Sequence, residues 1–321
     1  MKVHVIDEEH LPLRADLYMV GARCSLSTNS EDILASMARW RDSSPLERDE
    51  SFELRVLVDT GASRGRYSAP HFRGLHHLVF GNFGPGESFV FDLLRLRISS
   101  VVSEETACDE KFWNLRLLPT ALGLLGATIG VVPLHCACLD KHGEGLLLAG
   151  ASGTGKSSLA VALSRCGFAM VSDGWTFVGR TGDDLAAYGI SAPVKLLPDA
   201  VRHFPELRGF EATLASNGEM AFEVDAAQAF GAKVRSESKP RQLVFLERVE
   251  TPGCEIVPFS GDAAQKFFES NVERLPEQLK EAAKKRTELI RDLSVSECWL
   301  ARYGGPPQLA AEAISRFCEA M

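Results

Sequence analysis

The stretch Gly145–Arg165 reads GLLLAGASGTGKSSLAVALSR, and it decides the fold of the second half of the chain. It opens with an apolar run typical of a buried strand, and Ser157–Arg165 has the apolar spacing of an amphipathic helix. Between them, residues 150–157 match the pattern G-x-x-x-x-G-K-[ST] at every position. A strand, a glycine-rich turn and a helix in this order predict an α/β domain that binds a nucleoside triphosphate.

Each residue type in this loop has a physical task. Glycines let the backbone curl so that successive N–H groups face phosphate oxygens, and the helix from Lys156 adds the positive end of its dipole. Lys156 can reach the β- and γ-phosphates, and the Ser157 hydroxyl can ligate magnesium, so we expect ATP and Mg²⁺ as cofactors. The expected nucleotide-binding residues are Gly150, Ala151, Ser152, Gly153, Thr154, Gly155, Lys156, Ser157 and Ser158.

Composition and motifs exclude several other classes of protein. The formal net charge of −8 argues against a nucleic-acid binder, and the apolar and charged fractions are those of an ordinary globular protein. The sequence contains neither the LSGGQ signature of ABC transporters nor the NKxD motif of GTPases.

The string at Asp59–Ser63, DTGAS, matches aspartic proteases, but such enzymes need two facing aspartates and no second copy exists. We interpret it as an Asp/Gly turn after a strand.

The cysteines and the longest uncharged segment also have ordinary explanations. Cys136 and Cys138, two apart on a strand, are expected to be buried reduced thiols rather than metal ligands. Residues 117–139 carry no charge, but their prolines and the nearby loop favour a buried helix and strand over a membrane span. The charged first residues do not resemble a secretory signal, so we expect a cytoplasmic protein with no membrane partner.

Along the chain, the pattern predicts two domains. Residues 1–109 form an expected α+β domain, and residues 110–321 form the nucleotide-binding domain. A charged amphipathic helix over 273–291 is expected to lie on the surface. The other predicted strands are 17–25, 52–58, 78–80, 88–91, 94–102, 133–139, 145–148, 168–172, 177–179, 243–246 and 298–302, and the other predicted helices run to about Trp40, over 157–165 and at the carboxyl end.

Residues 133–178 resemble the core of the bacterial HPr kinase/phosphorylase family, which is related to ATP-dependent phosphoenolpyruvate carboxykinase. His135 stands fifteen residues before Gly150, where that family has a histidine, and the loop follows. The segment CGFAMVSD, ending at Asp173, resembles the family pattern R-G-H-x-L-V-A-D-D. Residues 241–248 (RQLVFLER) and 300–306 (LARYGGP) are similar to segments of smaller HPr-kinase-like proteins, including lasso-peptide kinases.

This resemblance implies a P-loop domain of the HPr kinase/carboxykinase type with a smaller N-terminal domain, and an ATP-dependent transfer of phosphate to a serine of a protein or peptide. It implies that Asp173 is the catalytic base and a metal ligand, with His135 and Lys156 also in the catalytic site. The family has two consecutive aspartates where this chain has Asp173-Gly174. Asp183 or Asp184 could substitute for the missing one, and Arg202 or Arg241 could stabilise charge on the transferred phosphoryl group.

Asp173 also stands out from the pattern alone, because ligands of open α/β sheets bind at the carboxyl ends of parallel strands. The alternatives are a nucleotide-binding regulatory module, favoured by Gly174, and a small-molecule kinase; carboxykinase activity is the least favoured. Residues for the reverse, phosphorylase reaction cannot be located. A homo-oligomer is compatible with the sequence.

Overall fold

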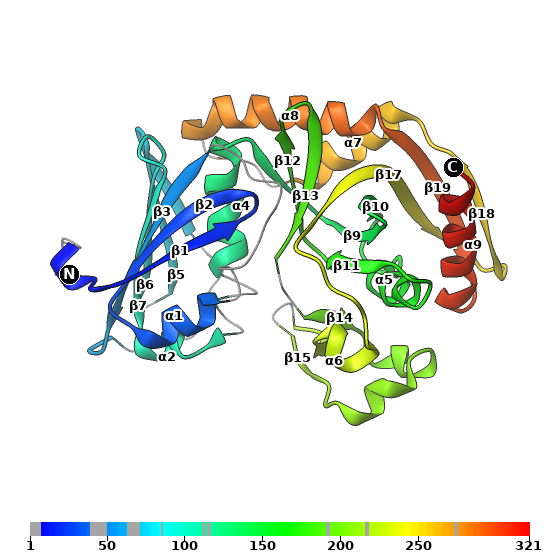
Figure 1. Ribbon diagram of the computed structural model, residues 1–321, viewed down its shortest axis with the longest axis horizontal. Helices are drawn as coiled ribbons and strands as arrows, with labels where there is room; N and C mark the ends of the chain where they lie inside the picture. Colours follow the sequence, from blue (N-terminus) through cyan, green and yellow to red (C-terminus); the bar gives the residue numbers. More distant parts are fainter. Residues whose placement is uncertain are drawn as a thin grey trace. The chain divides into compact units, whose positions relative to one another are not determined.

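A computed structural model of the chain describes residues 8–38, 50–62, 71–84, 86–110, 113, 117–190, 193–215, 218–272, 275 and 277–321. The chain divides into two compact units (Figure 1). The first contains residues 1–132 and 273–286, and the second contains 133–272 and 287–321. Residues 110–132 thus group with the first unit, and whether either unit is an independently folding domain stays a prediction.

The first unit is built on a mixed sheet with the strand order β1-β2-β3-β7-β6-β5-β4. Its strands are β1 (Leu13–Met19), β2 (Ala22–Thr28), β3 (Ser51–Asp59), β4 (His71–Leu75), β5 (Leu78–Gly84), β6 (Glu87–Asp92) and β7 (Arg97–Ser103). β2, β3 and β7 run parallel to one another, and the other neighbours are antiparallel. In β3, alternate residues are buried, as expected of a strand with one face on a core.

Short helical segments accompany this sheet: η1 (Glu8–His10), α1 (Glu31–Met37), α2 (Glu104–Ala107), α4 (Leu118–Thr128) and η6 (Glu277–Leu279). Ser30 caps α1 by accepting a hydrogen bond from the Ile33 N–H. The DTGAS string begins with the turn that the sequence predicts, because the Gly61 N–H donates to Asp59 Oδ1 at 2.9 Å.

The second unit contains the sheet that positions the candidate site, in the strand order β11-β9-β10-β17-β13-β12-β8, with β19 and β18 continuing from β17. Its strands are β8 (Val131–Leu134, at the unit boundary), β9 (Cys136–Lys141), β10 (Glu144–Ala149), β11 (Ala169–Ser172), β12 (Thr176–Thr181), β13 (Asp184–Gly189), β17 (Glu237–Arg248), β18 (Gly253–Pro258) and β19 (Glu297–Gly304). β10, β17 and β19 are parallel, whereas β9 runs antiparallel to both β10 and β11. β10 and β11 therefore point the same way.

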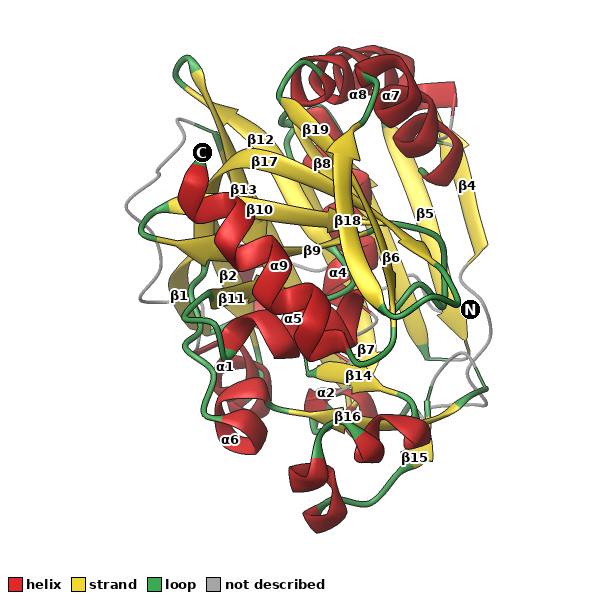
Figure 2. Cartoon of the chain, turned by 90° about the vertical axis from the view of Figure 1, so that its right-hand side faces the viewer, coloured by secondary structure: helices red, strands yellow, loops and turns green. Residues whose placement is uncertain are grey.

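Two helices, α5 (Lys156–Ser164) and α9 (Pro307–Ala320), pack against each other over this sheet (Figure 2). Both contribute fully buried alanines and aliphatic residues to one core with β9, β10 and β17. The remaining elements are β14 (Val194–Leu196), η4 (Pro198–Arg202), η5 (Pro205–Gly209), β15 (Thr213–Leu214), β16 (Met220–Val224), α6 (Ala226–Phe230), α7 (Gly261–Asn271) and α8 (Lys280–Ser294, with residues in both units). β14, β16 and β15 form a small separate sheet.

The mixed α/β class expected from the sequence is confirmed, with corrections in detail. The single strand predicted over 17–25 is wrong, because Val20 and Gly21 turn the chain between β1 and β2. The strand predicted over 133–139 is also interrupted, since His135 lies at a bend between β8 and β9. Of the helix predicted over 273–291, residues 273, 274 and 276 lie outside the described residues, and α8 continues to Ser294.

The cysteines are free thiols, and Cys136 and Cys138 are fully buried, as predicted. Among the described residues, no three His, Cys, Asp or Glu side chains are grouped as a metal-binding cluster. In the same part of the chain, no helix is long and apolar enough to cross a membrane.

Candidate active site

Three strand ends bring the predicted site residues to one edge of the second unit's sheet. The register pairs Ala149, at the end of β10, with Cys136, at the start of β9. Ser172, at the end of β11, pairs with Cys138 of the same strand. The residues just beyond these ends are Gly150, His135 and Asp173, so all three lie at the same edge of the sheet. This is the edge where α/β sheets bind ligands.

The loop over 150–155 passes very close to other backbone, which explains two of its glycines. A Cβ on Gly150 would lie 3.1 Å from the Leu246 carbonyl oxygen. Gly155 caps α5 in the left-handed conformation (φ 88°), and a Cβ there would collide with the Tyr303 hydroxyl. Side chains at either position would push the loop off the sheet.

Lys156 begins α5 and turns back over the loop. Its Nζ donates to the carbonyl oxygens of Gly150 (2.8 Å) and Ala151 (3.1 Å). Burial lowers the pKa of Lys156, and the negative charge of Asp173 opposes that effect. A buried ammonium that is held by loop carbonyls is available to exchange these acceptors for phosphate oxygens.

Asp173 has a buried oxygen with no fixed role in the fold. Its Oδ1 finds no hydrogen-bond partner among the described residues. Burial raises the pKa of Asp173 to about 6, and this rise is opposed by hydrogen bonds from the Ser157 hydroxyl and the Lys195 backbone and by the charge of Lys156. A carboxyl group with a pKa near neutrality is suited to accept a proton at physiological pH.

The same pair of residues fits magnesium. Mg²⁺ prefers oxygen ligands and is usually bound by one or two protein side chains together with phosphates and waters. Ser157 and Asp173 supply a hydroxyl and a carboxylate, the hydroxyl favours the ionised form of the carboxyl group, and the unpartnered Oδ1 is a free ligand atom. These residues would hold the ion without a larger cluster of carboxylates.

His135 lies beside this group rather than inside a strand. Burial, and to a lesser extent the Lys156 charge, lowers the pKa of His135, which favours a neutral imidazole at pH 7. The ring packs against the indole of Trp175, with centroids 5.4 Å apart and planes inclined by 42°. A neutral imidazole can accept or donate a hydrogen bond to a substrate at this edge.

Sequence reasoning missed two residues at this edge, Trp175 and Tyr303. Trp175 follows Asp173-Gly174 and remains 39% exposed although it is a large aromatic residue. Tyr303, on β19, is fully buried and donates its hydroxyl to the Thr154 carbonyl oxygen in the loop. The position of Trp175 next to Asp173 was a usable signal, whereas Tyr303 is 149 residues from Thr154 and no local pattern marks it.

Asp184, considered as a substitute for the missing aspartate, and Arg241, considered as a stabiliser of phosphoryl charge, lie at the opposite end of the sheet. Asp184 forms an ion pair with Lys239 at 2.7 Å, and Lys239 pairs with Glu144 where β10 begins. Arg241 lies five residues before Leu246 along β17, a span of roughly 16 Å in an extended strand. Neither side chain is brought to the loop.

Arg202 and Asp183 are likewise not assembled with the loop residues. Arg202 forms an ion pair with Asp199 at 3.0 Å, and both side chains are largely exposed. Asp183 lies exposed in the turn between β12 and β13. Neither residue has a described contact with the loop.

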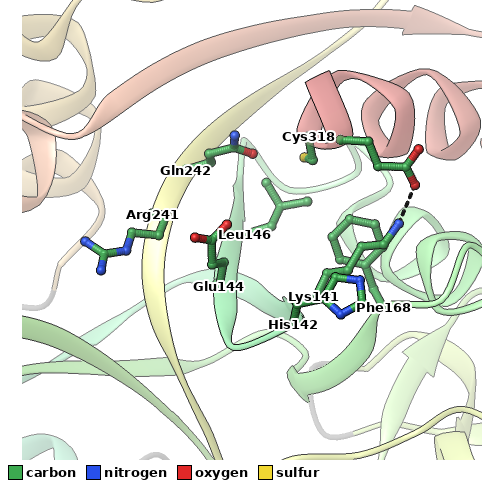
Figure 3. Close-up of a pocket in the computed structure, with 10 residues that line it drawn as sticks. Lys141, His142, Glu144, Leu146, Phe168, Arg241, Gln242 and Cys318 are labelled. Atoms are coloured by element: carbon green, nitrogen blue, oxygen red, sulfur yellow. Dashed lines mark hydrogen bonds and ion pairs between the residues drawn. The ribbon is translucent and has the colours of Figure 1, made fainter. Parts of the chain in front are cut away.

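A pocket opens at the far end of β10, separate from the loop (Figure 3). Its floor contains Leu146 and Phe168, and charged side chains including Lys141 and Glu144 surround it. Lys141 is engaged by an ion pair with Glu319 at 2.6 Å, drawn as a dashed line in Figure 3. Arg241, at the pocket margin, belongs to this end of the sheet.

Part of the chain is similar in sequence to known proteins. No family model matches the chain. The HPr kinase/phosphorylase of Lachnoclostridium phytofermentans is 36% identical over 78 residues, which are 24% of this chain and 23% of that protein. The HPr kinase/phosphorylase of an Exiguobacterium species is 33% identical over 115 residues, 36% of this chain and 31% of that protein. The chain thus spans less than a third of the length of these relatives.

A solved structure, the Hpr(Ser) kinase/phosphatase of Coxiella burnetii, aligns with 59% of this chain and 94% of that one, at 14% identity and a TM-score of 0.28. That likeness is too distant to define the fold. The sequence matches, by contrast, agree on one family name among all the curated relatives found. The resemblance to the HPr kinase/phosphorylase family is therefore confirmed, and over the matched segment this chain is HPr-kinase-like.

Proposed function

We propose that this protein is an ATP-dependent phosphotransferase that phosphorylates the hydroxyl group of a serine in a protein or peptide. One observation carries the proposal: the Asp173 carboxyl group has a buried oxygen without a partner among the described residues, and the Ser157 hydroxyl and Lys156 charge of the loop helix favour its ionised form. A phosphotransferase needs this proximity of proton acceptor, metal ligand and phosphate loop. The HPr-kinase-like sequence supports the same chemistry and suggests the serine acceptor.

In the proposed reaction, the loop and Lys156 bind the triphosphate of ATP. Ser157 and Asp173 would hold magnesium, which would supply positive charge against the phosphates. The acceptor oxygen forms a bond to the γ-phosphorus while the bond from that phosphorus to the bridging oxygen of the β-phosphate breaks, and ADP leaves. The acceptor proton passes to Asp173, whose pKa of about 6 keeps it largely ionised at neutral pH.

The acceptor side of the site is assigned to His135 and Trp175. His135, with its lowered pKa, provides a neutral hydrogen-bonding group beside the phosphate loop. Trp175 presents an exposed aromatic surface next to Asp173, and such a surface favours a flexible peptide chain over a small polar metabolite. For residues 1–109 we propose substrate selection or assembly, and for the protein a cytoplasmic location where ATP is available.

The test is a transfer assay with [γ-³²P]ATP and magnesium. The acceptors are serine-containing peptides, proteins encoded beside this gene, and HPr, the protein in the relatives' names. Transfer of label to an acceptor by the wild type, with loss of transfer in Asp173→Asn, is the expected result. Equal transfer by Asp173→Asn would remove Asp173 as the base.

One observation favours a different function, a nucleotide-binding regulatory module. Gly174 stands where the family has its second aspartate. It takes the left-handed conformation (φ 91°), and no described atom lies within 4 Å of where its Cβ would be, so no other carboxylate occupies that position. Under this alternative the protein binds MgATP tightly and transfers label to none of the acceptors. The assay above separates the two functions when ATP binding is measured on the same samples.

A further inference from the structure

Tyr303, on β19, is hydrogen-bonded to the nucleotide loop, which follows a different strand, β10. Its phenol is fully buried, and its hydroxyl donates to the Thr154 carbonyl oxygen. On β19 it pairs with Arg248 of β17 on one side and with Cys254 of β18 on the other, so its backbone is fixed by two neighbouring strands. The hydroxyl is therefore presented to the loop by a strand that is paired on both sides.

The surroundings hold the phenol ring in place. The Arg248 guanidinium lies over the Tyr303 ring at 4.8 Å from its centroid and donates to the Gly305 carbonyl oxygen at 2.9 Å. On the loop side, the phenolic oxygen occupies the space that a side chain at residue 155 would need. The loop glycine and the tyrosine are thus fitted to each other.

The other described hydrogen bonds of residues 150–154 involve Lys156 or lie within the loop. Lys156 Nζ holds the carbonyl oxygens of Gly150 and Ala151, and the Thr154 hydroxyl also donates to the Ala151 oxygen at 2.8 Å. When Lys156 turns toward bound phosphates, it releases its two carbonyls. The Tyr303–Thr154 hydrogen bond does not involve Lys156.

We infer that Tyr303 is a positioning residue for nucleotide binding. Its hydroxyl fixes the peptide that joins Thr154 to Gly155, and this keeps the N–H groups at the start of α5 directed at the phosphates before ATP arrives. Preorganisation of this kind acts on affinity, because a loop that is already ordered loses less entropy on binding. Tyr303 does not touch the acceptor, so the rate of the transfer step is unaffected. The inference rests on the proposed function only in requiring that the loop binds a nucleotide.

The test is Tyr303→Phe, which keeps the ring and removes the hydroxyl. The matched control is Tyr188→Phe on β13, since Tyr188 is also buried and its hydroxyl is hydrogen-bonded, to Thr181 at 3.0 Å, away from the loop. Isothermal titration with MgATP, and with magnesium tripolyphosphate as a probe without the nucleoside, gives the dissociation constants. Thermal unfolding of each variant shows whether it is folded.

We expect Tyr303→Phe to raise the dissociation constants of both ligands by roughly 10-fold, the effect of one lost hydrogen bond to a buried carbonyl. Tyr188→Phe should leave both dissociation constants unchanged. In the transfer assay, KM for ATP rises and kcat stays within about 3-fold. Unchanged affinity in folded Tyr303→Phe, or an equal loss in Tyr188→Phe, would overturn the inference. If the wild type binds neither ligand, the proposed function fails instead. That result differs from the two outcomes that would overturn the role of Tyr303.

Discussion

Asp173 is subject to two opposing requirements, because burial disfavours its charged form while the proton abstraction that we propose for it needs that form. The balance is set by Ser157, the Lys195 backbone and Lys156, which all favour the carboxylate against the larger effect of burial. The net result is a pKa of about 6 instead of 3.8. The free protein therefore stores an unfavourable interaction at a residue that its fold does not need.

Replacement of Asp173 by Asn should separate activity from stability. The loss of the base lowers transfer by about 100-fold or more, while nucleotide binding persists because the loop is intact. At pH 7.5 the variant gains on the order of 1–2 kcal/mol of unfolding free energy, because a partly buried charge is removed. The measurements are transfer rate, MgATP affinity and urea unfolding. Asp184→Asn is the control, and a comparable loss of transfer in that variant would contradict the assignment.

The raised pKa of Asp173 also predicts the pH dependence. Transfer rate should increase with pH as Asp173 ionises and then level off, since the base must be ionised. Stability has the opposite sign: between pH 3.8 and about 6 the folded state holds a proton that the unfolded state has lost, so this contribution falls as pH rises. Comparison of unfolding free energies of wild type and Asp173→Asn from pH 4 to 7 isolates it. A difference that does not change with pH would show that the Asp173 pKa is not raised.

Trp175 provides a prediction for the acceptor side. Trp175→Ala should raise KM for a peptide acceptor by roughly 3- to 10-fold, the usual strength of an aromatic contact, and leave KM for ATP unchanged. Trp175→Phe should restore most of the affinity. The control is Phe80→Ala, because Phe80 is 41% exposed in the first unit. If Trp175→Ala raised only KM for ATP, the indole would lie on the nucleotide side of the site.

At the scale of elements, the active-site edge depends on how β11 and β13 pass each other. Gly189 ends β13, and a Cβ there would lie inside contact distance of the Val171 carbonyl oxygen, two residues before Asp173. The Gly189 N–H also donates to the Ser236 carbonyl oxygen at 2.8 Å, so the strand cannot easily shift away. The strand end that carries Asp173 is thus packed against glycine backbone.

Gly189→Ala should therefore destabilise the protein by about 3 kcal/mol or more and reduce transfer as well. The control Gly209→Ala, on η5, meets no atom within 4 Å and should stay within about 0.5 kcal/mol of wild type. Urea unfolding measures both. A Gly189→Ala variant as stable as Gly209→Ala would mean that β11 and β13 are less closely packed than described here.

The elements that the sequence predicted well are the ones with strong apolar patterns. β10 and α5 follow directly from GLLLAG and SSLAVALSR, and β3 from its alternation. The missed elements lack such a pattern: β4 is mostly exposed, and β14 has three residues. The β1–β2 hairpin was missed because Val20, a β-branched residue, takes the left-handed conformation (φ 50°) that turns usually assign to Gly or Asn.

At the scale of the whole molecule, the sequence predicts a site when its residues lie near strand ends, and it fails when they meet through tertiary packing. His135, the loop and Asp173 come together because β9, β10 and β11 are consecutive in the chain and adjacent in the sheet. Tyr303 reaches the loop only through the β10–β17–β19 order, which brings distant segments together. Arg241 was considered from its residue type, but its position on β17 places it at the wrong end.

Binding of a nucleoside triphosphate by residues 150–157 is tested by isothermal titration of the full chain and of its Lys156→Ala variant with MgATP. We predict saturable binding by the wild type with a dissociation constant in the micromolar to millimolar range, and no detectable binding by a folded Lys156→Ala protein. Wild-type protein that shows no binding heat at millimolar MgATP, or a Lys156→Ala variant that binds MgATP equally well, would show that residues 150–157 are not the nucleotide site.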